Sequence, residues 1–288
     1  MSPSAPVVIR PAATVILLRE KHAVIEALMT LRHSNLAFMG GQWVFPGGAV
    51  APSDTSDAAL ALVSQHDTFT CKRMRTLQGQ PLPLNECLGL AIAACRETFE
   101  ETGVLLASHA NGRPCEPAAL SRLQSQRTQI TQQPTLFLEM LAEEQLQLDL
   151  QRLIYWAHWI TPSNSSRRFD TRFFAIAAPD SHEVSADAGE TAEYRWQSPA
   201  ASLDAARQGA MPMPPPTLRT LRELQESISR HRTLDALLRA EASRPVAPIL
   251  PKIVRDNERT AVVMPWDEGY AQAPGEGAAY DIGNRGTD

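Results

Sequence analysis

Cysteine is scarce in this sequence and shows no spacing that would define a disulfide framework or a zinc site. The 288 residues include four cysteines, at positions 71, 87, 95 and 115, with no CxxC pair among them. Small secreted domains and structural zinc sites depend on dense or closely spaced cysteines. We therefore expect reduced thiols in a cytoplasmic protein.

Long apolar runs and an excess of basic residues are absent as well. No apolar stretch reaches the roughly 18 residues of a membrane-spanning helix, and no secretory signal is recognisable. The C-terminus, Arg285 to Asp288, is unlike a Ser-Lys-Leu peroxisomal address. The net charge of −5 argues against a protein that holds duplex nucleic acid mainly through its phosphates. We therefore expect no membrane or duplex partner, and any phosphate site must be local.

The residues that are present suit a globular α/β protein. Hydrophobic residues make up 43% of the chain and charged residues 20%, which is ordinary for a chain with a buried core. Short β-branched runs and helical patterns occur without an internal repeat. We predict a hairpin of strands at 12–18 and 24–31, an extended piece at 43–45, helical segments at 117–146, strands at 153–160 and 172–178, two or three helices after Pro199, and a strand-like segment at 261–266.

One predicted helix combines an apolar stripe with a cluster of carboxylates. Between Asn85 and Thr102 the apolar residues recur at helical steps, and Gly103 is well placed to end the helix in the left-handed conformation. The stripe consists of Leu88, Ile92, Cys95 and Phe99. Glu97, Glu100 and Glu101 project together on the opposite face. We therefore expect one face to pack and the other to hold charge.

Three carboxylates in one helical turn repel one another, so their clustering needs a compensating partner. A solvated helix face is the plain alternative, because most runs of charged residues in soluble proteins lie on such a surface. Upstream, however, Phe45-Pro46-Gly47-Gly48 predicts a turn whose backbone can approach a ligand. Mg²⁺ is held by carboxylates together with substrate phosphates. The combination indicates phosphoryl or pyrophosphoryl chemistry, with Arg96 orienting a glutamate by an ion pair.

These residues resemble the signature of the Nudix hydrolase family, Gly-x5-Glu-x7-Arg-Glu-U-x-Glu-Glu-x-Gly-U, where U is a bulky aliphatic residue. The second half matches at Arg96, Glu97, Glu100, Glu101, Gly103 and Val104, with Thr98 departing at the first U. The first half matches at Gly48, but Asp54 stands where glutamate is expected. Arg96 lies 34 residues beyond position 62, where unbroken spacing would place it. An insertion at about 55–88 therefore splits the box.

The split box is similar to that of the peroxisomal coenzyme A diphosphatases and their bacterial relatives, a likeness strengthened by Thr161-Pro162 and by the run from Arg168 to Phe174. This resemblance implies an α/β/α Nudix sandwich with a mixed sheet and a helical insertion inside the box. It implies Mg²⁺ or Mn²⁺ as cofactor, with Glu97, Glu100 and Glu101 as metal ligands. We expect a Nudix domain at 1–198 and a C-terminal helical extension with a tail at 199–288, packed on the same domain.

A second pattern bears on the substrate. Coenzyme A-cleaving relatives carry Leu-Leu-Thr-x-Arg at a fixed distance before Phe-Pro-Gly-Gly, and here Leu28, Thr30, Arg32 and Gly41 keep that register while Met29, His33 and Ala37 depart from it. Arg32, Gly47 and Gly48 are thus candidate substrate-binding residues, because a guanidinium pairs with phosphate oxygens. A second basic cluster consists of Arg167, Arg168 and Arg172. It could bind the ribose phosphate of a nucleotide, and Arg168 is its candidate substrate-binding residue. A surface role remains open for both arginine sites.

The proposed reaction also needs a base that activates water. Glu97 is one candidate because of its place in the cluster. In the family, a base can also precede a strand that contains tryptophan, and Glu190 lies six residues before Trp196. Glu190 is the first candidate outside the box, followed by Glu183 and Glu193.

The sequence therefore predicts a metal-dependent hydrolase that converts coenzyme A or acyl-coenzyme A to 3′,5′-ADP and 4′-phosphopantetheine or its acyl form. A Nudix pyrophosphatase for ADP-ribose, dinucleotides or capped RNA is the nearest alternative. A regulator that binds a nucleotide without cleaving it is an alternative of another class, against which the intact glutamates argue. The sequence does not decide the oligomeric state and leaves a homodimer open.

Overall fold

The computed structural model describes residues 7–63, 71–179, 183–185, 189–256 and 259–277. The strands are β1 (Ile9–Lys21), β2 (Val24–Arg32), β3 (Trp43–Val44), β4 (Gly47–Ala49), β5 (Ala107–His109), β6 (Leu146–Leu148), β7 (Ile154–Ile160), β8 (Arg168–Ala177), β9 (Thr191–Gln197), β10 (Pro248–Ile249), β11 (Lys252–Asp256) and β12 (Arg259–Val263). The α-helices are α1 (Asp57–Ala61), α3 (Leu84–Thr102), α4 (Pro117–Ser125), α5 (Arg127–Gln132), α6 (Thr135–Glu143), α7 (Pro199–Arg207), α8 (Pro215–Arg230) and α9 (Leu234–Glu241). Two short 3₁₀ helices span Pro52–Thr55 and Leu150–Arg152.

A mixed sheet of eight strands forms the centre of the described structure. Its main path runs β10-β7-β8-β1-β2-β3, with β4 paired to β1 and β9 paired to β2. Strand β1 is parallel to β8 and antiparallel to β2 and β4. Because β1 and β2 diverge beyond their hairpin, β3 pairs with β2 while β4 pairs with β1. The segment from Trp43 to Ala49 thus lies between these two long strands.

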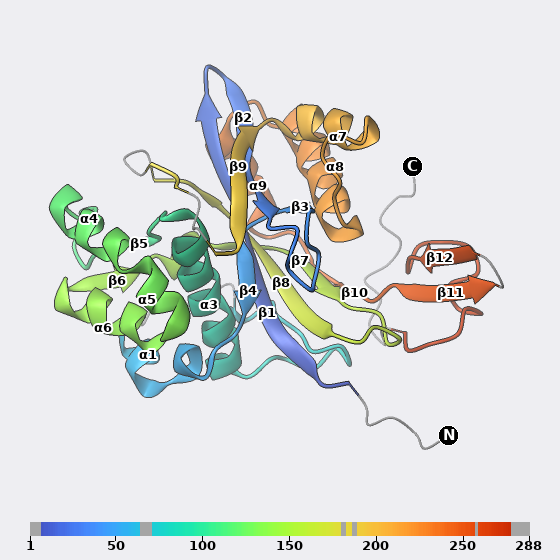
Figure 1. Cartoon of the computed structure of the whole chain (residues 1–288), viewed down its shortest axis with the longest axis horizontal. Coiled ribbons are helices and arrows are strands. Elements are labelled where there is room, and N and C mark those ends of the chain that lie inside the picture. Colours follow the sequence, from blue (N-terminus) through green and yellow to red (C-terminus); the bar gives the residue numbers. More distant parts are fainter. Residues whose placement is uncertain (1–6, 64–70, 180–182, 186–188, 257–258, 278–288) are drawn as a thin grey trace.

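The two faces of the sheet are covered by different helices (Figure 1). Strand β1 shows the cause, since alternate side chains of a strand point to opposite faces. Ala13, Val15 and Leu17 join the core formed with α3 to α6, whereas Ile16 and Leu18 join the core formed with α8 and α9. The result is a three-layer α/β sandwich with a mixed sheet. The family-based prediction of the fold class is confirmed at this level.

Most elements predicted from the sequence are present. The hairpin of β1 and β2, the buried strands β7 and β8, and three helices after Pro199 are all found. The carboxylate-bearing helix is α3, which begins at Leu84 and ends at Thr102. The segment predicted as helical at 117–146 contains α4, α5 and α6, but its last residue belongs to β6. Within the predicted insertion at 55–88, the described helix α1 is short. The predicted division of the chain into a domain at 1–198 and an extension at 199–288 stays a prediction.

Two expectations about local structure were wrong. Gly47 and Gly48 belong to strand β4, paired with Thr14 and Ala13, and do not form a turn. The strand-like segment at 261–266 is a strand only as far as Val263. The alternative of a solvated face on α3 opposite the apolar stripe is excluded, because Glu100 and Glu101 are 6% and 5% exposed. The helix lies between the sheet and the residues that follow β4, so both of its faces are covered.

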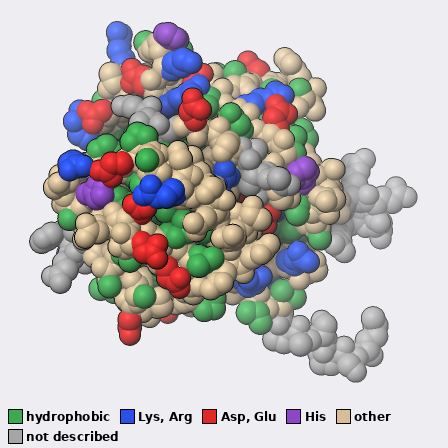
Figure 2. Space-filling model, turned by 60° about the vertical axis from the view of Figure 1, so that its left-hand side comes forward, with side chains coloured by type: hydrophobic (Ala, Val, Ile, Leu, Met, Phe, Trp, Pro, Cys, Tyr) green, Lys and Arg blue, Asp and Glu red, His purple; other side chains and the backbone are tan. Residues whose placement is uncertain are grey.

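The outer surface carries charges of both signs. On the side that includes α4 to α6, acidic and basic side chains are interspersed with neutral and apolar ones, without a continuous basic area (Figure 2). All four cysteines are buried and none of them forms a disulfide in the described structure, as expected of reduced thiols. Among the described residues, no helix combines the length and the apolar character needed to cross a bilayer.

Candidate active site

The C-terminal half of α3 brings the predicted site residues beside strand β4. Gly103 ends the helix in the left-handed conformation, with φ of 73°, and its N–H donates to the carbonyl of Phe99. Ile92, Cys95 and Phe99 are fully buried in the core, which fixes the rotation of the helix about its axis. Glu97 and Glu101, four residues apart, consequently share the face that meets β4.

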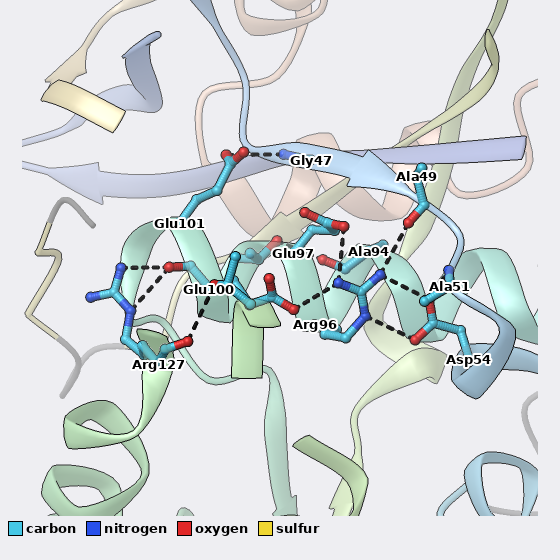
Figure 3. A network of polar contacts seen from close by, with 12 residues as sticks. Gly47, Ala49, Ala51, Asp54, Ala94, Arg96, Glu97, Glu100, Glu101 and Arg127 are labelled. Atoms are coloured by element: carbon cyan, nitrogen blue, oxygen red, sulfur yellow. Dashed lines mark hydrogen bonds and ion pairs between the residues drawn. The ribbon is translucent and has the colours of Figure 1, made fainter. Parts of the chain in front are cut away.

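Arg96 is buried at the centre of an ion-pair network (Figure 3). Its Nε and Nη2 donate to the two carboxylate oxygens of Asp54, each at 2.9 Å. Its Nη1 donates to Glu97 at 2.9 Å and to Glu100 at 2.7 Å, and Nη2 also donates to the carbonyl of Ala49 at 3.0 Å. Hydrogen bonds and charge from these carboxylates raise the pKa of Arg96 despite the opposing effect of burial. The guanidinium therefore remains charged and orients both glutamates.

Asp54 holds Arg96 in place and was the residue whose role the sequence left undecided. It is fully buried, and its Oδ2 also accepts the Ala51 N–H at 2.8 Å, which closes the 3₁₀ turn at Pro52–Thr55. Asp54 thus closes a local turn and also fixes Arg96, the first residue of the second half of the signature. The signal was available in the sequence, since Asp54 stands at the glutamate position of the first half of the signature.

Glu97 lies directly over the backbone of Gly48. A β-carbon built on Gly48 would be 2.4 Å from the carboxylate carbon of Glu97, a distance that real side chains do not adopt. Glycine is therefore required here for the approach of the carboxylate. Arg96 balances part of the charge of Glu97, whose side chain is 17% exposed.

Glu101 reaches the neighbouring residue of the same strand. Its Oε2 accepts the Gly47 N–H at 3.2 Å. Gly47 has φ of 155°, and a β-carbon on it would lie 2.3 Å from the carbonyl oxygen of Ala13. The two glycines thus let strand β4 lie closely between β1 and the glutamates. This role differs from the predicted one, in which the two glycines form a turn whose backbone approaches a ligand.

Arg32 and Glu190 complete the cluster at the end of β2. Arg32 Nη1 lies 3.9 Å from Glu101 Oε1, and Nη2 lies 3.4 Å from Glu190 Oε2. The carbonyl of Glu190 accepts the His33 N–H at 2.9 Å, which ties the start of β9 to the end of β2. The Glu190 side chain is 47% exposed. The structure therefore brings Glu190 together with Glu97 and Glu101, residues far from it in the sequence.

Glu100 points elsewhere. Its carboxylate is paired with Arg96 and is also hydrogen-bonded by Thr131. Its pKa is raised by burial and lowered by these partners. Of the three glutamates in the box, Glu97 and Glu101 are the pair directed to the glycine strand, whereas Glu100 strengthens the network that holds Arg96.

The electrostatics of the cluster show a shortage of positive charge. Burial raises the pKa of Glu97 to about 7, with Arg96 opposing the rise and the nearby Glu100 and Glu190 adding to it. Burial and the charge of Glu97 raise the pKa of Glu101 well above its ordinary value, with Arg32 opposing. Two buried carboxylates that disfavour each other's ionisation form an environment in which a cation is stabilising.

The donor atoms of this cluster fit a divalent cation of the magnesium type, which takes oxygen ligands and is held by one or two carboxylates. As the side chains stand, no group of three or more histidine, cysteine, aspartate or glutamate residues among the described part of the chain is gathered into a metal-binding arrangement. Arg32 and Arg96 occupy positions between the carboxylates. The carboxylate oxygens thus fit the ion in type and charge, but they are not gathered around one point as the side chains stand.

The remaining candidates lie outside this cluster. Glu193 pairs with Arg195 at 2.6 Å and lies across from Leu31, on the sheet face that packs against α8. Glu183 is exposed, in the segment before β9. Arg168 is 7% exposed and pairs with Glu276 at 3.0 Å. Within the described residues, no ion pair joins these three side chains to Glu97 or Glu101.

Arg172, which the sequence grouped with Arg168, is not at a solvated strand end. It is 1% exposed, pairs with Asp170, and donates from Nη2 to the carbonyl of Arg75 at 2.9 Å. Sequence reasoning missed this buried role, and nothing in the spacing of the basic residues would have separated Arg172 from its neighbours.

Comparison with known proteins places these features in context. The family model described as the NUDT19 Nudix domain matches residues 5–224. The chain is 29% identical over 229 residues to the acyl-coenzyme A diphosphatase NUDT19 of Xenopus laevis, covering 69% of this chain and 59% of that protein. For the protein of the same name from Homo sapiens, the identity is 29% over 276 residues, covering 85% of this chain and 72% of that protein.

Among solved structures, a NUDIX hydrolase from Alicyclobacillus acidocaldarius is 25% identical, with a TM-score of 0.61. The alignment covers 82% of this chain and 97% of that chain. The match to the Xenopus relative spans less than two thirds of that protein's length.

Proposed function

The chain belongs to the Nudix hydrolases, in the NUDT19 Nudix domain family, and from this premise we propose that it hydrolyses the diphosphate of coenzyme A or of an acyl-coenzyme A. The products are 3′,5′-ADP and 4′-phosphopantetheine or its acyl form. The names of the Xenopus and human relatives support this substrate class, as does the register of Arg32 before the glycine strand.

The observation that carries the proposal is the convergence of four charged residues at one place. Glu97 and Glu101 meet strand β4 from α3, while Arg32 and the more exposed Glu190 lie at their edge. Such a site offers carboxylates for a cation and a guanidinium for a phosphate, side by side. A diphosphate with a bound divalent cation matches this site, because its cation can meet the carboxylates and its phosphate oxygens can meet the guanidinium.

Glu97 and Glu101 would hold Mg²⁺ or Mn²⁺. The bound ion would supply a water of lowered pKa and neutralise charge on the diphosphate. Arg32 would bind a phosphate oxygen. Its ion pairs with Glu101 and Glu190 are long, at 3.9 and 3.4 Å, and its buried Nε has no hydrogen-bond partner among the described residues. The guanidinium is thus available to a better acceptor.

Glu190 is the proposed base, which takes a proton from the attacking water at a carboxylate oxygen. Its side chain is 47% exposed, so water and substrate can reach it, while Glu97 is mostly covered by Arg96 and Gly48. Glu190→Gln should therefore lower kcat with little change in metal affinity. An unchanged kcat in this variant moves the role to Glu97 or Glu183.

A substrate panel tests the proposed function. The purified chain is incubated with Mg²⁺ and coenzyme A, an acyl-coenzyme A, ADP-ribose, a dinucleotide or capped RNA, and the products are separated by chromatography. The proposal expects 3′,5′-ADP from the coenzyme A compounds at the highest kcat/KM. Faster cleavage of another compound overturns the substrate while leaving a Nudix pyrophosphatase. Binding without cleavage of any compound supports the regulator.

A further inference from the structure

The last carbonyl groups of α3 are bound by residues from two other parts of the chain. The carbonyl of Glu100 accepts Arg127 Nε at 3.1 Å and Nη2 at 2.7 Å, and the carbonyl of Gly103 accepts the Gln124 side chain at 3.0 Å. The carbonyl of Thr102 accepts the Ser185 N–H at 2.9 Å. A helix leaves its final carbonyls without partners inside the helix. Here α4, α5 and the segment before β9 supply those partners.

Arg127 makes contacts on two sides at once. Besides the Glu100 carbonyl, its Nη1 donates to the Ser185 carbonyl at 3.0 Å and to the Ser185 hydroxyl at 2.7 Å. The residue is 8% exposed, and Figure 3 shows its guanidinium directed at the backbone of Glu100. One guanidinium thus joins the end of the glutamate helix to Ser185. Its planar set of donors allows this simultaneous binding, which a lysine ammonium would not reproduce.

Ser185 lies five residues before Glu190 in the sequence. Ser185 is held against the end of α3, and Glu190 is held against β2 through the His33 N–H and Arg32. These attachments lie on the two elements that carry the other site residues, Glu101 and Arg32. Residues 186–188, which lie between Ser185 and Glu190 in the sequence, are outside the described residues.

We propose that Arg127 is a positioning residue, which sets the distance of Glu190 from the glutamates of α3 by clamping Ser185 to the end of that helix. This inference rests on the proposed function, since it takes Glu190 as the base. A displacement of about 1 Å at a reacting group can cost on the order of 100-fold in rate. The clamp also gives the helical segment of α4 to α6 a role in the site, although none of its side chains belongs to the carboxylate cluster.

The test compares Arg127→Met with the matched control Arg122→Met. Arg122 lies in the same helical segment and pairs with Glu144 at 2.7 Å, with a side chain 61% exposed. Arg127→Met should lower kcat by about 10- to 100-fold, as is usual for residues that orient a metal or catalytic group, with KM for coenzyme A nearly unchanged. Arg122→Met should leave both constants at wild-type values. Millimolar guanidinium should restore part of kcat to Arg127→Ala and none to Glu190→Gln.

Ser185→Ala is the second variant, because Ser185 is exposed and its replacement leaves the core intact. It removes one acceptor of Arg127 and should lower kcat less than Arg127→Met does, again at unchanged KM. If Arg127→Met fails to fold, a wild-type kcat in Ser185→Ala overturns the clamp.

Hydrogen exchange separates the clamp from the proposed activity. In Arg127→Met, the amides of 183–185 and 189–191 should exchange faster than in wild type, while those of β1 and β7 keep their rates. Equal exchange in Arg127→Met and Arg122→Met would overturn the clamp whether or not coenzyme A is cleaved. If exchange rises but the wild-type chain cleaves no compound of the panel, the clamp stands and the proposed function falls.

Discussion

At the scale of single residues, the site is organised by one buried arginine and two glycines. Arg96 balances the carboxylates of Asp54, Glu97 and Glu100. Gly47 and Gly48 let strand β4 lie close to Glu101 and Glu97. The residue types and most of the positions followed from the sequence. The direction of each glutamate did not, because adjacent residues on one helical turn differ by about 100° in direction, and only their partners show which of them reaches the glycines.

Replacing Glu101 and Glu100 separately tests that difference. Glu101→Gln should lower kcat at least about 100-fold at unchanged thermal stability, because its charge belongs to the proposed cation site, where an ion is worth several kcal/mol. Glu100→Gln keeps an oxygen acceptor for Arg96 and should lower kcat by roughly tenfold or less, as a supporting residue does. Steady-state kinetics with Mg²⁺ measure both. Equal losses of kcat in the two variants would contradict the different roles given to Glu101 and Glu100.

Gly48→Ala should displace Glu97 without disturbing the backbone. The added β-carbon would stand 2.4 Å from the Glu97 carboxylate, whose side chain can rotate away. We expect kcat to fall at least about tenfold, because the carboxylate moves by more than 1 Å. Gly112→Ala is the control, since a β-carbon there meets nothing within 4 Å. Its left-handed φ of 79° costs stability but should leave kcat unchanged. A fully active Gly48→Ala variant argues against Glu97.

At the scale of elements, helices with a regular pattern of buried apolar residues were predictable from the sequence. Contacts between residues far apart in the sequence were not. Helix α3 differs from its predicted bounds by one residue, because apolar residues at steps of three and four and a terminal glycine define it. The link of Asp54 to Arg96 spans 42 residues of sequence and depends on how the intervening segment folds back. Likewise, nothing local tied Arg127 to Ser185, whose contact arises from the packing of α5 on α3.

The packing of α6 on α3 has its own test. The rings of Phe99 and Phe137 lie 5.7 Å apart between centroids, and both are buried. Aromatic pairs of this kind contribute about 0.5–1.5 kcal/mol beyond the area they bury. A double-mutant cycle with Phe99→Leu and Phe137→Leu, measured by urea denaturation, should give a coupling free energy in this range. A coupling near zero would show that the two helices do not meet at these residues.

At the scale of the whole molecule, the sheet with helices on both faces was predictable from the family resemblance and from the strand patterns. The order of the strands was not, because β8 pairs in parallel with β1 across more than 150 residues of sequence. The buried polar group of His158, Asp170 and Arg172 was also not predicted. It joins β7 to β8, with His158 Nε2 2.5 Å from Asp170 Oδ1.

This group predicts how stability depends on pH. Burial lowers the pKa of His158 to about 4, with Asp170 opposing and Arg172 adding to the shift. A group whose pKa is lower in the folded state stabilises the fold above its unfolded pKa of about 6.5. His158 should therefore contribute a loss of about 3 kcal/mol as the pH drops from about 6.5 to 4, and the raised pKa values of Glu97 and Glu101 act in the opposite direction. Asp170, whose pKa of about 2 lies below its ordinary value, should add a further loss below about pH 4.

Urea denaturation of the wild-type chain and of His158→Gln between pH 7 and 4 measures this dependence. The variant has no imidazole to protonate. The part of the slope of unfolding free energy against pH that is due to one proton should therefore disappear in it. An unchanged slope would show that His158 titrates in the fold as it does in the unfolded chain.

The proposed function requires that the cluster of Glu97, Glu101 and Glu190 cleaves a diphosphate. The most direct test is the rate at which the purified wild-type chain and Glu101→Gln release 3′,5′-ADP from coenzyme A with Mg²⁺. We predict release by the wild type that stops on adding EDTA, and a rate at least about 100-fold lower in the variant. No release by the wild type, or equal rates in the two proteins, would contradict it.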